Sequence, residues 1–182
     1  VYDDLSTDYP YGKQTKKRGG MWYTPVSGIW QNVWMENVPN HYIKKLTLTP
    51  DTKSVKIGLD VETADFKAAL TLHNGEVVKR EFVGKEGIID LSEITLDDGT
   101  SYEPKLWTPE NPYLYHMTIT TAEDKIDTYF ALRTIEIKEI NGVSRVLLNG
   151  KPIFLHGVLD QGYFCDGIFL PANEEEYEKD IL

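Results

Sequence analysis

Aromatic side chains near the start of the chain are the first candidates for ligand chemistry. Trp22 and Tyr23 lie in a stretch without regular periodicity, and further tryptophans stand at positions 30, 34 and 107. Because an aromatic face packs well against the apolar face of a pyranose, such residues could form a platform for a sugar. Trp30 and Trp34 are better explained as core, and Trp107, beside prolines, as a packed loop anchor. Trp22 and Tyr23 therefore remain the candidate pair, with an ordinary structural role as the alternative.

A second candidate site follows an apolar segment near the end of the chain. Residues 157–159 are followed by Asp160, Gln161 and Tyr163. If the apolar segment ends the first strand of a (β/α) barrel, these three side chains emerge at the carboxyl end of that strand, the face where barrel enzymes build their sites. We predict that Asp160, Gln161 and Tyr163 bind substrate, and ordinary loop polarity is the alternative.

The remaining reactive side chains suggest no catalytic set. Among 29 acidic residues some pair always looks suitable, but Glu36 and Glu62 fall at predicted strand ends and Asp97 and Asp98 in a turn. The four histidines show neither a metal-ligand spacing nor a nearby activated nucleophile. A single cysteine, Cys165, allows no internal disulfide. We therefore predict no catalytic residue, no metal site and no cofactor in this chain.

The elements expected to position these residues are mostly short strands. In one stretch Val55, Ile57, Leu59 and Val61 alternate with polar or small residues, which is typical of a half-buried antiparallel strand. The expected strands are 42–48, 55–61, 69–73, 77–83, 87–91, 113–121, 125–132 and 134–138. Turn residues separate them, and Asn74-Gly75 predicts a tight hairpin. No helical pattern interrupts this series, so the fold class is predicted as all-β, an immunoglobulin-like antiparallel β-sandwich.

The regions on either side of the predicted sandwich have a different character. Residues 1–20 are polar and predict a loop, whereas the run 28–38, rich in Trp, Ile and Val, predicts a strand. Towards the other end, Asn149-Gly150 predicts a second hairpin whose second arm continues as an apolar strand over 152–159. Asn173 then predicts the N-cap of a helix with acidic residues in its first turn. A strand followed by the start of a helix is typical of the beginning of a (β/α) barrel.

Charge and hydropathy exclude two classes of partner. The formal net charge is −10, and the only basic cluster is Lys16-Lys17-Arg18, so we expect no nucleic-acid partner. No window approaches the 18 apolar residues needed to span a membrane, and the N-terminus lacks the features of a signal peptide. The absence of an initial Met suggests an excised fragment or a processed product. The compartment, periplasm or cytoplasm, and the oligomeric state therefore stay open.

Three stretches of the sequence, in this order and spacing, resemble glycoside hydrolase family 2, the family of β-galactosidases, β-glucuronidases and β-mannosidases. They are 26–33 (Val-Ser-Gly-Ile-Trp-Gln-Asn-Val), 106–115 (Leu-Trp-Thr-Pro-Glu-Asn-Pro-Tyr-Leu-Tyr), and 130–133 (Phe-Ala-Leu-Arg) leading to 148–158 (Leu-Asn-Gly-Lys-Pro-Ile-Phe-Leu-His-Gly-Val). The resemblance implies a jelly-roll sugar-binding domain, a sandwich and a catalytic (β/α)8 barrel. It assigns residues 1–38 to the tail of the jelly roll, 39–140 to the sandwich, and 141–182 to a linker hairpin and the start of the barrel.

The same resemblance implies a function for the parent protein. It implies retaining hydrolysis of β-linked O-glycosides in carbohydrate metabolism, with a carbohydrate bound by the full-length protein and both catalytic glutamates beyond Leu182. The 182-residue chain alone is then scaffold and is predicted to be inactive. Residues 159–162 (Leu-Asp-Gln-Gly) replace the Asn-Arg-His-Glu of β-galactosidases, and 22–25 (Trp-Tyr-Thr-Pro) replace an Asp-containing motif, so galactose specificity is not implied. The alternative is a stand-alone module that binds carbohydrate or protein.

Overall fold

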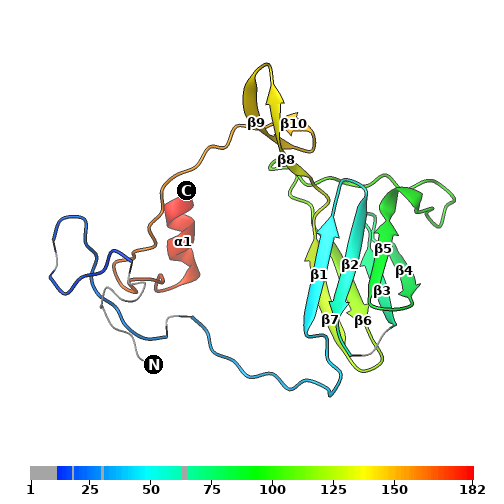
Figure 1. The fold of residues 1–182 in the computed structure, drawn as a ribbon, viewed down its shortest axis with the longest axis horizontal. Coiled ribbons are helices and arrows are strands. Elements are labelled where there is room, and N and C mark those ends of the chain that lie inside the picture. Colours follow the sequence, from blue (N-terminus) through cyan, green and yellow to red (C-terminus); the bar gives the residue numbers. More distant parts are fainter. Residues whose placement is uncertain (1–11, 18, 30, 63–64) are drawn as a thin grey trace. The chain divides into compact units, whose positions relative to one another are not determined.

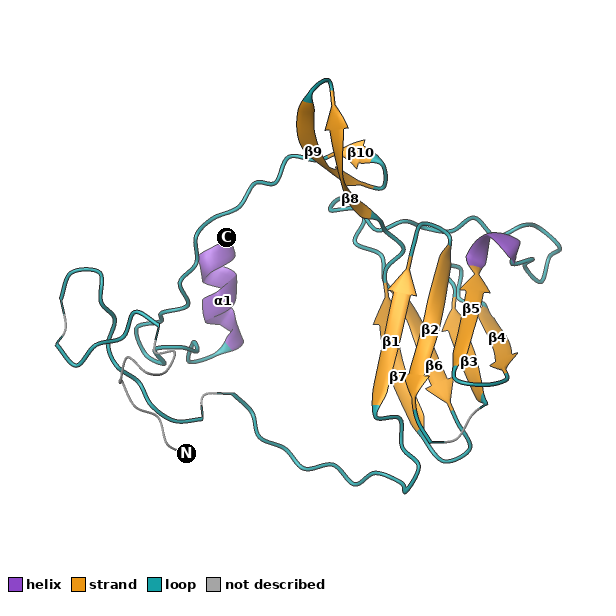
Figure 2. Ribbon diagram, in the orientation of Figure 1, coloured by secondary structure: helices purple, strands orange, loops and turns teal. Residues whose placement is uncertain are grey.

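The chain folds into two compact units. The structure, a computed structural model, describes residues 12–182 except 18, 30 and 63–64. One unit is Asn37–His156, and the other combines Val1–Glu36 with Gly157–Leu182. The larger unit contains all the regular strands among the described residues (Figures 1 and 2).

Two antiparallel sheets form the body of the larger unit. The first has the order β1-β2-β5, with β1 at Lys45–Pro50, β2 at Ser54–Asp60 and β5 at Glu86–Asp90. The second has the order β4-β3-β6-β7, with β3 at Phe66–Thr71, β4 at Val77–Phe82, β6 at Tyr115–Thr120 and β7 at Lys125–Phe130. The predicted immunoglobulin-like antiparallel β-sandwich is therefore confirmed, with strand ends that differ by a few residues. The strand expected at 134–138 is formed at Ile135–Ile140 but belongs to a separate sheet.

The core lies between these two sheets because their strands alternate buried and exposed positions. In β2 the side chains of Val55, Ile57 and Leu59 are buried, while Lys56 and Asp60 face solvent. The second sheet contributes its buried residues from three strands: Phe66, Ala68, Leu70, Tyr115, Met117, Ile119 and Phe130. Each fully buried large apolar side chain contributes about 1.5–3 kcal/mol, so this alternation is the main source of stability.

The sheets approach each other closely where β4 lies beside β5. The Phe82 ring of β4 stacks on Phe66 with ring centroids 4.8 Å apart. A Cβ atom built on Gly87 of β5 would collide with the Phe82 ring. A glycine is thus required at position 87 by packing and not by its backbone angles.

Three Asn-Gly turns differ in conformation. Both residues have positive φ in Asn141-Gly142 (53° and 77°) and Asn149-Gly150 (51° and 76°), as a type I′ turn requires. These turns join β8 (Ile135–Ile140), β9 (Val143–Leu148) and β10 (Lys151–Pro152) into a third sheet. The predicted hairpin at Asn74-Gly75 is confirmed, but only Gly75 has positive φ, because the connection is longer and closes between the Leu72 amide and the Glu76 carbonyl.

Trp107 and Asn149 tie the third sheet to the sandwich. The Trp107 amide donates to the Leu132 carbonyl at 2.9 Å, and the Asn149 side-chain amide donates to the Trp107 carbonyl at 3.0 Å. The Asn149 side-chain oxygen also accepts from the Thr134 amide at 3.0 Å. The Arg133 guanidinium lies over the Trp107 ring, 4.8 Å from its centroid. Trp107 is therefore a loop anchor, as its position beside prolines predicts.

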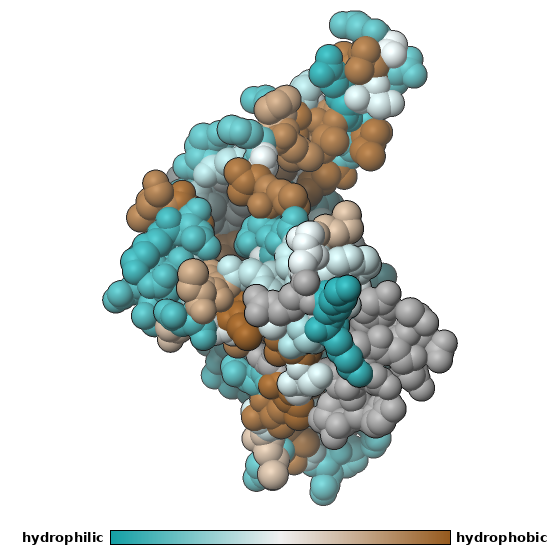
Figure 3. Space-filling view, turned by 90° about the vertical axis from the view of Figure 1, so that its left-hand side faces the viewer, coloured by the Kyte–Doolittle hydropathy of each residue, from teal (hydrophilic) through white to brown (hydrophobic). Residues whose placement is uncertain are grey.

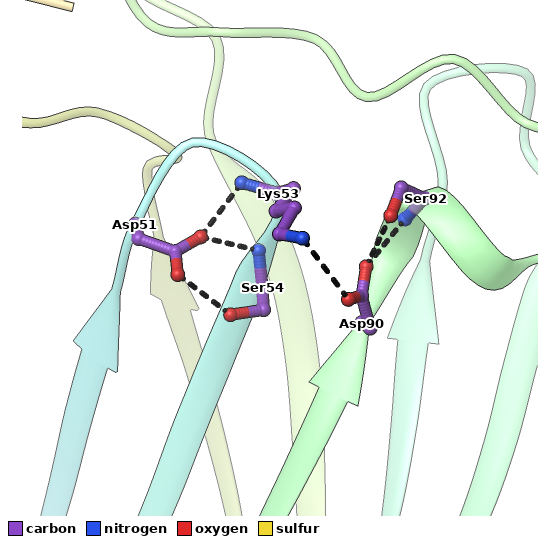
Figure 4. Close-up of polar contacts among 5 residues, drawn as sticks. All are labelled: Asp51, Lys53, Ser54, Asp90 and Ser92. Carbon is purple, nitrogen blue, oxygen red and sulfur yellow. Dashed lines mark hydrogen bonds and ion pairs between the residues drawn. The ribbon is translucent and has the colours of Figure 1, made fainter.

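A polar cluster closes one end of the β1-β2-β5 sheet (Figure 4). Asp51 accepts hydrogen bonds from the amides of Lys53 and Ser54 and from the Ser54 hydroxyl. Asp90 accepts from the amide and hydroxyl of Ser92 and lies 4.0 Å from the Lys53 ammonium. Burial raises the pKa of Asp51, but the hydrogen bonds outweigh it and lower the pKa overall. The cluster fixes the β1–β2 turn next to the end of β5.

Two predicted strands are absent from the structure. Residues 28–38 contain no strand among those described, and the predicted core residue Trp34 is 74% exposed. The predicted core residue Trp30 lies outside the described residues. The second arm of the last hairpin ends after Pro152, and no strand follows over 153–160. Both segments are apolar, but a strand also needs a neighbouring strand to hydrogen-bond with. In the part of the chain that the structure describes, residues 28–38 pair with no strand, and the second segment keeps only the hydrogen bond from the Ile153 amide to the Val146 carbonyl, at 2.9 Å.

The predicted helix is confirmed as α1 (Glu174–Ile181). The side chain of its N-cap, Asn173, accepts a hydrogen bond from the Glu176 amide, and three acidic residues occupy the first turn. Over the described residues, no helix has the length and apolar character needed to cross a membrane.

Exposed apolar side chains mark the third sheet. Ile135 and Ile137 share one face of β8 and are 64% and 76% exposed, and Phe154 beyond β10 is 87% exposed. Figure 3 shows brown side chains on this sheet, which stands at the top of that view. One face of the sheet is therefore left without packing partners among the described residues.

Candidate functional site

Trp22 and Tyr23 are held by a loop that folds back on itself. The Trp22 amide donates to the Gly19 carbonyl at 3.3 Å, and the Tyr23 amide donates to the Lys13 carbonyl at 2.8 Å. Tyr23 and Gln14 also form an isolated parallel bridge. These backbone contacts place the two rings on neighbouring positions without a regular strand.

Tyr163 meets Tyr23 from the other end of the sequence. Their rings stack with centroids 4.4 Å apart and an interplanar angle of 24°. Phe169 packs edge-on against Tyr163 at 5.4 Å and 62°. Burial, and to a smaller extent the nearby Tyr23, raises the pKa of Tyr163 above its ordinary value, so its hydroxyl is protonated at neutral pH.

An open hollow of about 660 Å³ lies at this stack. Its lining residues are Gly19, Trp22, Tyr23, Thr24 and Tyr163. The Trp22 side chain is 45% exposed, so its ring is available to a ligand. Aromatic faces beside a few hydroxyl groups are the chemistry that holds a pyranose ring. Thr24 was missed by sequence reasoning, although it directly follows the aromatic pair.

A second hollow, of about 820 Å³, lies in the same unit. It is lined by Gln14, Val26, Ser27, Gly28, Ile29, Gln161, Gly162, Gly167, Phe169 and Leu170. The Gln14 side-chain oxygen accepts from the Val26 amide at 2.7 Å, which fixes one wall. Gln161 is exposed and contributes polar groups to it. The Ser27-Gly28 pair belongs to a stretch that carries the family resemblance, but its lining role could not be foreseen.

Asp160 takes a different place from the other predicted site residues. Its carboxylate accepts a hydrogen bond from the Gly162 amide at 2.7 Å, and it lines neither hollow. The structure thus brings Trp22, Tyr23 and Tyr163 together at the first hollow and places Gln161 in the wall of the second. Asp160 shapes the turn that carries Gln161 and Tyr163.

Glu36, Asp98 and His41 each contact a neighbouring side chain. Glu36 accepts from the Trp34 indole at 2.8 Å, and Asp98 accepts from the amide and hydroxyl of Thr100. His41 lies 2.7 Å from a carboxylate oxygen of Glu123. The described residues contain no group of three or more His, Cys, Asp or Glu that could hold a metal ion.

The known proteins that this chain is similar to include β-galactosidases and β-glucuronidases. A β-galactosidase from Thermoanaerobacter pseudethanolicus is 26% identical over 172 residues, which are 88% of this chain and 23% of that protein. A β-glucuronidase from Rattus norvegicus is 28% identical over 144 residues, 72% of this chain and 21% of that protein. A solved β-glucuronidase from Faecalibacterium prausnitzii has a TM-score of 0.60 at 26% identity, covering 79% of this chain and 22% of that one.

The chain spans less than a quarter of the length of these three relatives. The model of the family described as glycosyl hydrolases family 2 matches residues 34–133, more than half of the chain, and this region contains the whole two-sheet sandwich. The chain therefore belongs to glycosyl hydrolases family 2.

Proposed function

We propose that the parent protein is a retaining glycoside hydrolase that cleaves β-linked O-glycosides, and that this chain supplies scaffold and substrate-side loops. The observation that carries the proposal is the hollow at the Tyr23–Tyr163 stack, in a chain of this family. Its two walls come from segments that precede and follow the sandwich in sequence. A sugar unit would stack on the Trp22 or tyrosine rings, with the Thr24 and Tyr163 hydroxyls as hydrogen-bond partners.

Catalysis is proposed to lie outside this chain. Retaining hydrolysis needs two carboxyl groups about 5–5.5 Å apart on either side of the scissile bond. Glu36, Glu62 and Asp98 bind indole, ammonium and hydroxyl groups of their neighbours, which favours structural roles for them. In this proposal residues 141–182 are a linker hairpin and the start of a (β/α)8 barrel that carries the catalytic glutamates, and 1–38 are the tail of a jelly roll. The helix at 174–181 supports the barrel assignment.

The proposal is tested on the 182-residue chain. We expect no release of nitrophenol from p-nitrophenyl β-galactoside or β-glucuronide. Galactose or glucuronate at high concentration should shift the amide resonances of Trp22, Tyr23 and Tyr163. Tyr163→Ala should weaken this binding about two- to tenfold, because an aromatic contact is worth about 0.5–1.5 kcal/mol beyond area burial.

A matched control is Tyr129→Ala, since Tyr129 is an exposed aromatic residue on β7 of the sandwich at 62% exposure. It should leave sugar binding unchanged. Hydrolysis by the chain alone, abolished by substitution of one of its own carboxylates, would refute the assignment of catalysis elsewhere. Equal losses from Tyr163→Ala and Tyr129→Ala would refute the binding role of the stack.

The second candidate function is a stand-alone binding module. The observation in its favour is that the sandwich, Asn37–His156, forms a compact unit without the flanking segments. The coding sequence beyond Leu182 separates the two proposals. A continuing βα pattern with an Asn-Glu pair supports the hydrolase, and a stop codon or a repeat of the sandwich supports the module.

A further inference from the structure

A polar hollow lies on the outer face of the β1-β2-β5 sheet. Its volume is about 520 Å³. The lining residues are Lys45, Thr47, Thr49, Lys56, Gly58, Leu59, Asp60, Lys85 and Glu86. All belong to the sandwich, and none contributes to the hollows described above.

Gly58 forms the floor of this hollow. It stands in the central strand β2, in register with Thr47 of β1 and Glu86 of β5. The φ angle of Gly58 is not positive, so its backbone suits any residue. A Cβ atom built on Gly58 would lie 3.9 Å from the Thr47 Cβ, an ordinary contact. Gly87 differs, because there a Cβ would collide with Phe82. Neither backbone nor packing therefore requires glycine at 58, although glycine weakens a strand interior and often marks close approach of a ligand.

The charges around the floor favour an anion. Lys56 pairs with Glu86 at 3.1 Å, which leaves Lys45, Lys85 and Asp60 around the other part of the hollow. The structure gives Lys45 and Lys85 no ion-pair partner among the residues it describes. Asp60 is the register partner of Lys45, so the lining holds three lysines against two carboxylates, a formal charge of +1. In a chain of net charge −10 this is a locally positive site.

We propose that this hollow binds an acidic oligosaccharide, with a uronate carboxylate between Lys45 and Lys85 and sugar hydroxyls against Thr47 and Thr49. Because β2 is hydrogen-bonded on both sides, by β1 and by β5, no backbone group of the floor is free to pair with a peptide strand. The hydroxyl and ammonium groups of the lining match the hydroxyls and carboxylates of such a sugar, and the Asp60 carboxylate can accept a hydrogen bond from a sugar hydroxyl. The proposal concerns the sandwich alone and does not depend on the hydrolase assignment.

The test is a titration of the 182-residue chain, labelled with ¹⁵N, with trigalacturonate. The amides of Thr47, Gly58 and Lys85 should shift, and added salt should weaken the binding because ammonium–carboxylate contacts are screened. Gly58→Val should weaken binding at least about tenfold, because its methyl groups occupy the hollow, while the thermal midpoint stays the same or rises. Lys45→Gln and Lys85→Gln should each weaken it about two- to fivefold, as for exposed ion pairs.

Lys79→Gln, on β4 of the other sheet, removes the same charge and should leave binding unchanged. Three results would overturn the proposal: no shifts up to about 10 mM trigalacturonate, equal binding of neutral galactotriose, or stronger binding of a tri-glutamate peptide. Full retention of binding by Gly58→Val would also overturn it.

Discussion

The substitution Tyr115→Phe removes a single buried oxygen atom, yet it should lower the free energy of unfolding of the sandwich measurably. Tyr115 is fully buried, and its oxygen accepts from the Lys105 amide at 2.6 Å and lies 3.1 Å from the Tyr102 hydroxyl. Loss of this oxygen leaves the amide without its partner, which costs about 1–3 kcal/mol. Tyr102→Phe is the matched variant, because Tyr115 can still accept from the amide, so only about 0.5–1.5 kcal/mol should be lost. His73, 2.7 Å from the Tyr102 hydroxyl, is exposed and can bond to water instead.

Urea unfolding followed by fluorescence measures both costs. With a slope of about 1–3 kcal/mol per M urea, the midpoint of Tyr115→Phe should fall by about 1 M and that of Tyr102→Phe by about half as much, at unchanged slope. A Tyr102→Phe variant as destabilised as Tyr115→Phe would refute the reasoning, because the amide would then not be the group that carries the cost.

Three other substitutions probe the fold. Asn149→Gly keeps the positive φ but removes two side-chain hydrogen bonds, so the free energy of unfolding should fall by about 1–3 kcal/mol in the same urea assay; an unchanged midpoint would contradict the anchoring role. The hydrogen bond to Glu123 raises the pKa of His41. The stability that protonated His41 contributes is therefore complete below pH 6.5 and is lost as pH rises through the raised pKa. His41→Gln should flatten that part of the stability profile, and a slope identical to the parent chain would contradict it. The Ser92 hydroxyl lowers the pKa of Asp90, so the stability that ionised Asp90 contributes is present above pH 3.8 and is lost as pH falls through the lowered pKa. Ser92→Ala should therefore reduce the loss of stability in acid. An unchanged dependence of stability on pH below 3.8 would show that this hydrogen bond contributes nothing.

The sandwich was predictable because its strands carry their information locally. In β2 alternation alone identifies the buried face, and Asn149-Gly150 predicts a turn that the positive φ angles of both residues confirm. The run 28–38 shows the limit of this reasoning. Its Trp, Val and Ile residues have high strand propensity, but propensity describes a half-buried, paired surface and cannot supply the neighbouring strand. The same limit explains the missing strand after Pro152.

The candidate site was predictable as residue types and not as an arrangement. Trp22, Tyr23 and Tyr163 were chosen for their aromatic chemistry and for their place after an apolar segment, and no local pattern links the beginning of the chain to its end. The stack between Tyr23 and Tyr163 arises from tertiary contact between two loops. Asp160 shows the converse, since an Asp followed two residues later by Gly is also a turn signal, and its carboxylate is used by the Gly162 amide.

Glycine is the residue for which the structure adds most to the sequence. Gly58 and Gly87 both occupy strand interiors and are indistinguishable by pattern, yet a side chain collides with Phe82 at one and meets only ordinary contact at the other. Substitution at 87 must therefore disturb the join between the sheets, whereas substitution at 58 need not disturb the fold at all. Position 58 tolerates a side chain and still carries none, and two lysines without an ion-pair partner among the described residues line the same hollow. Ligand binding explains this glycine more simply than the folding of the strand does.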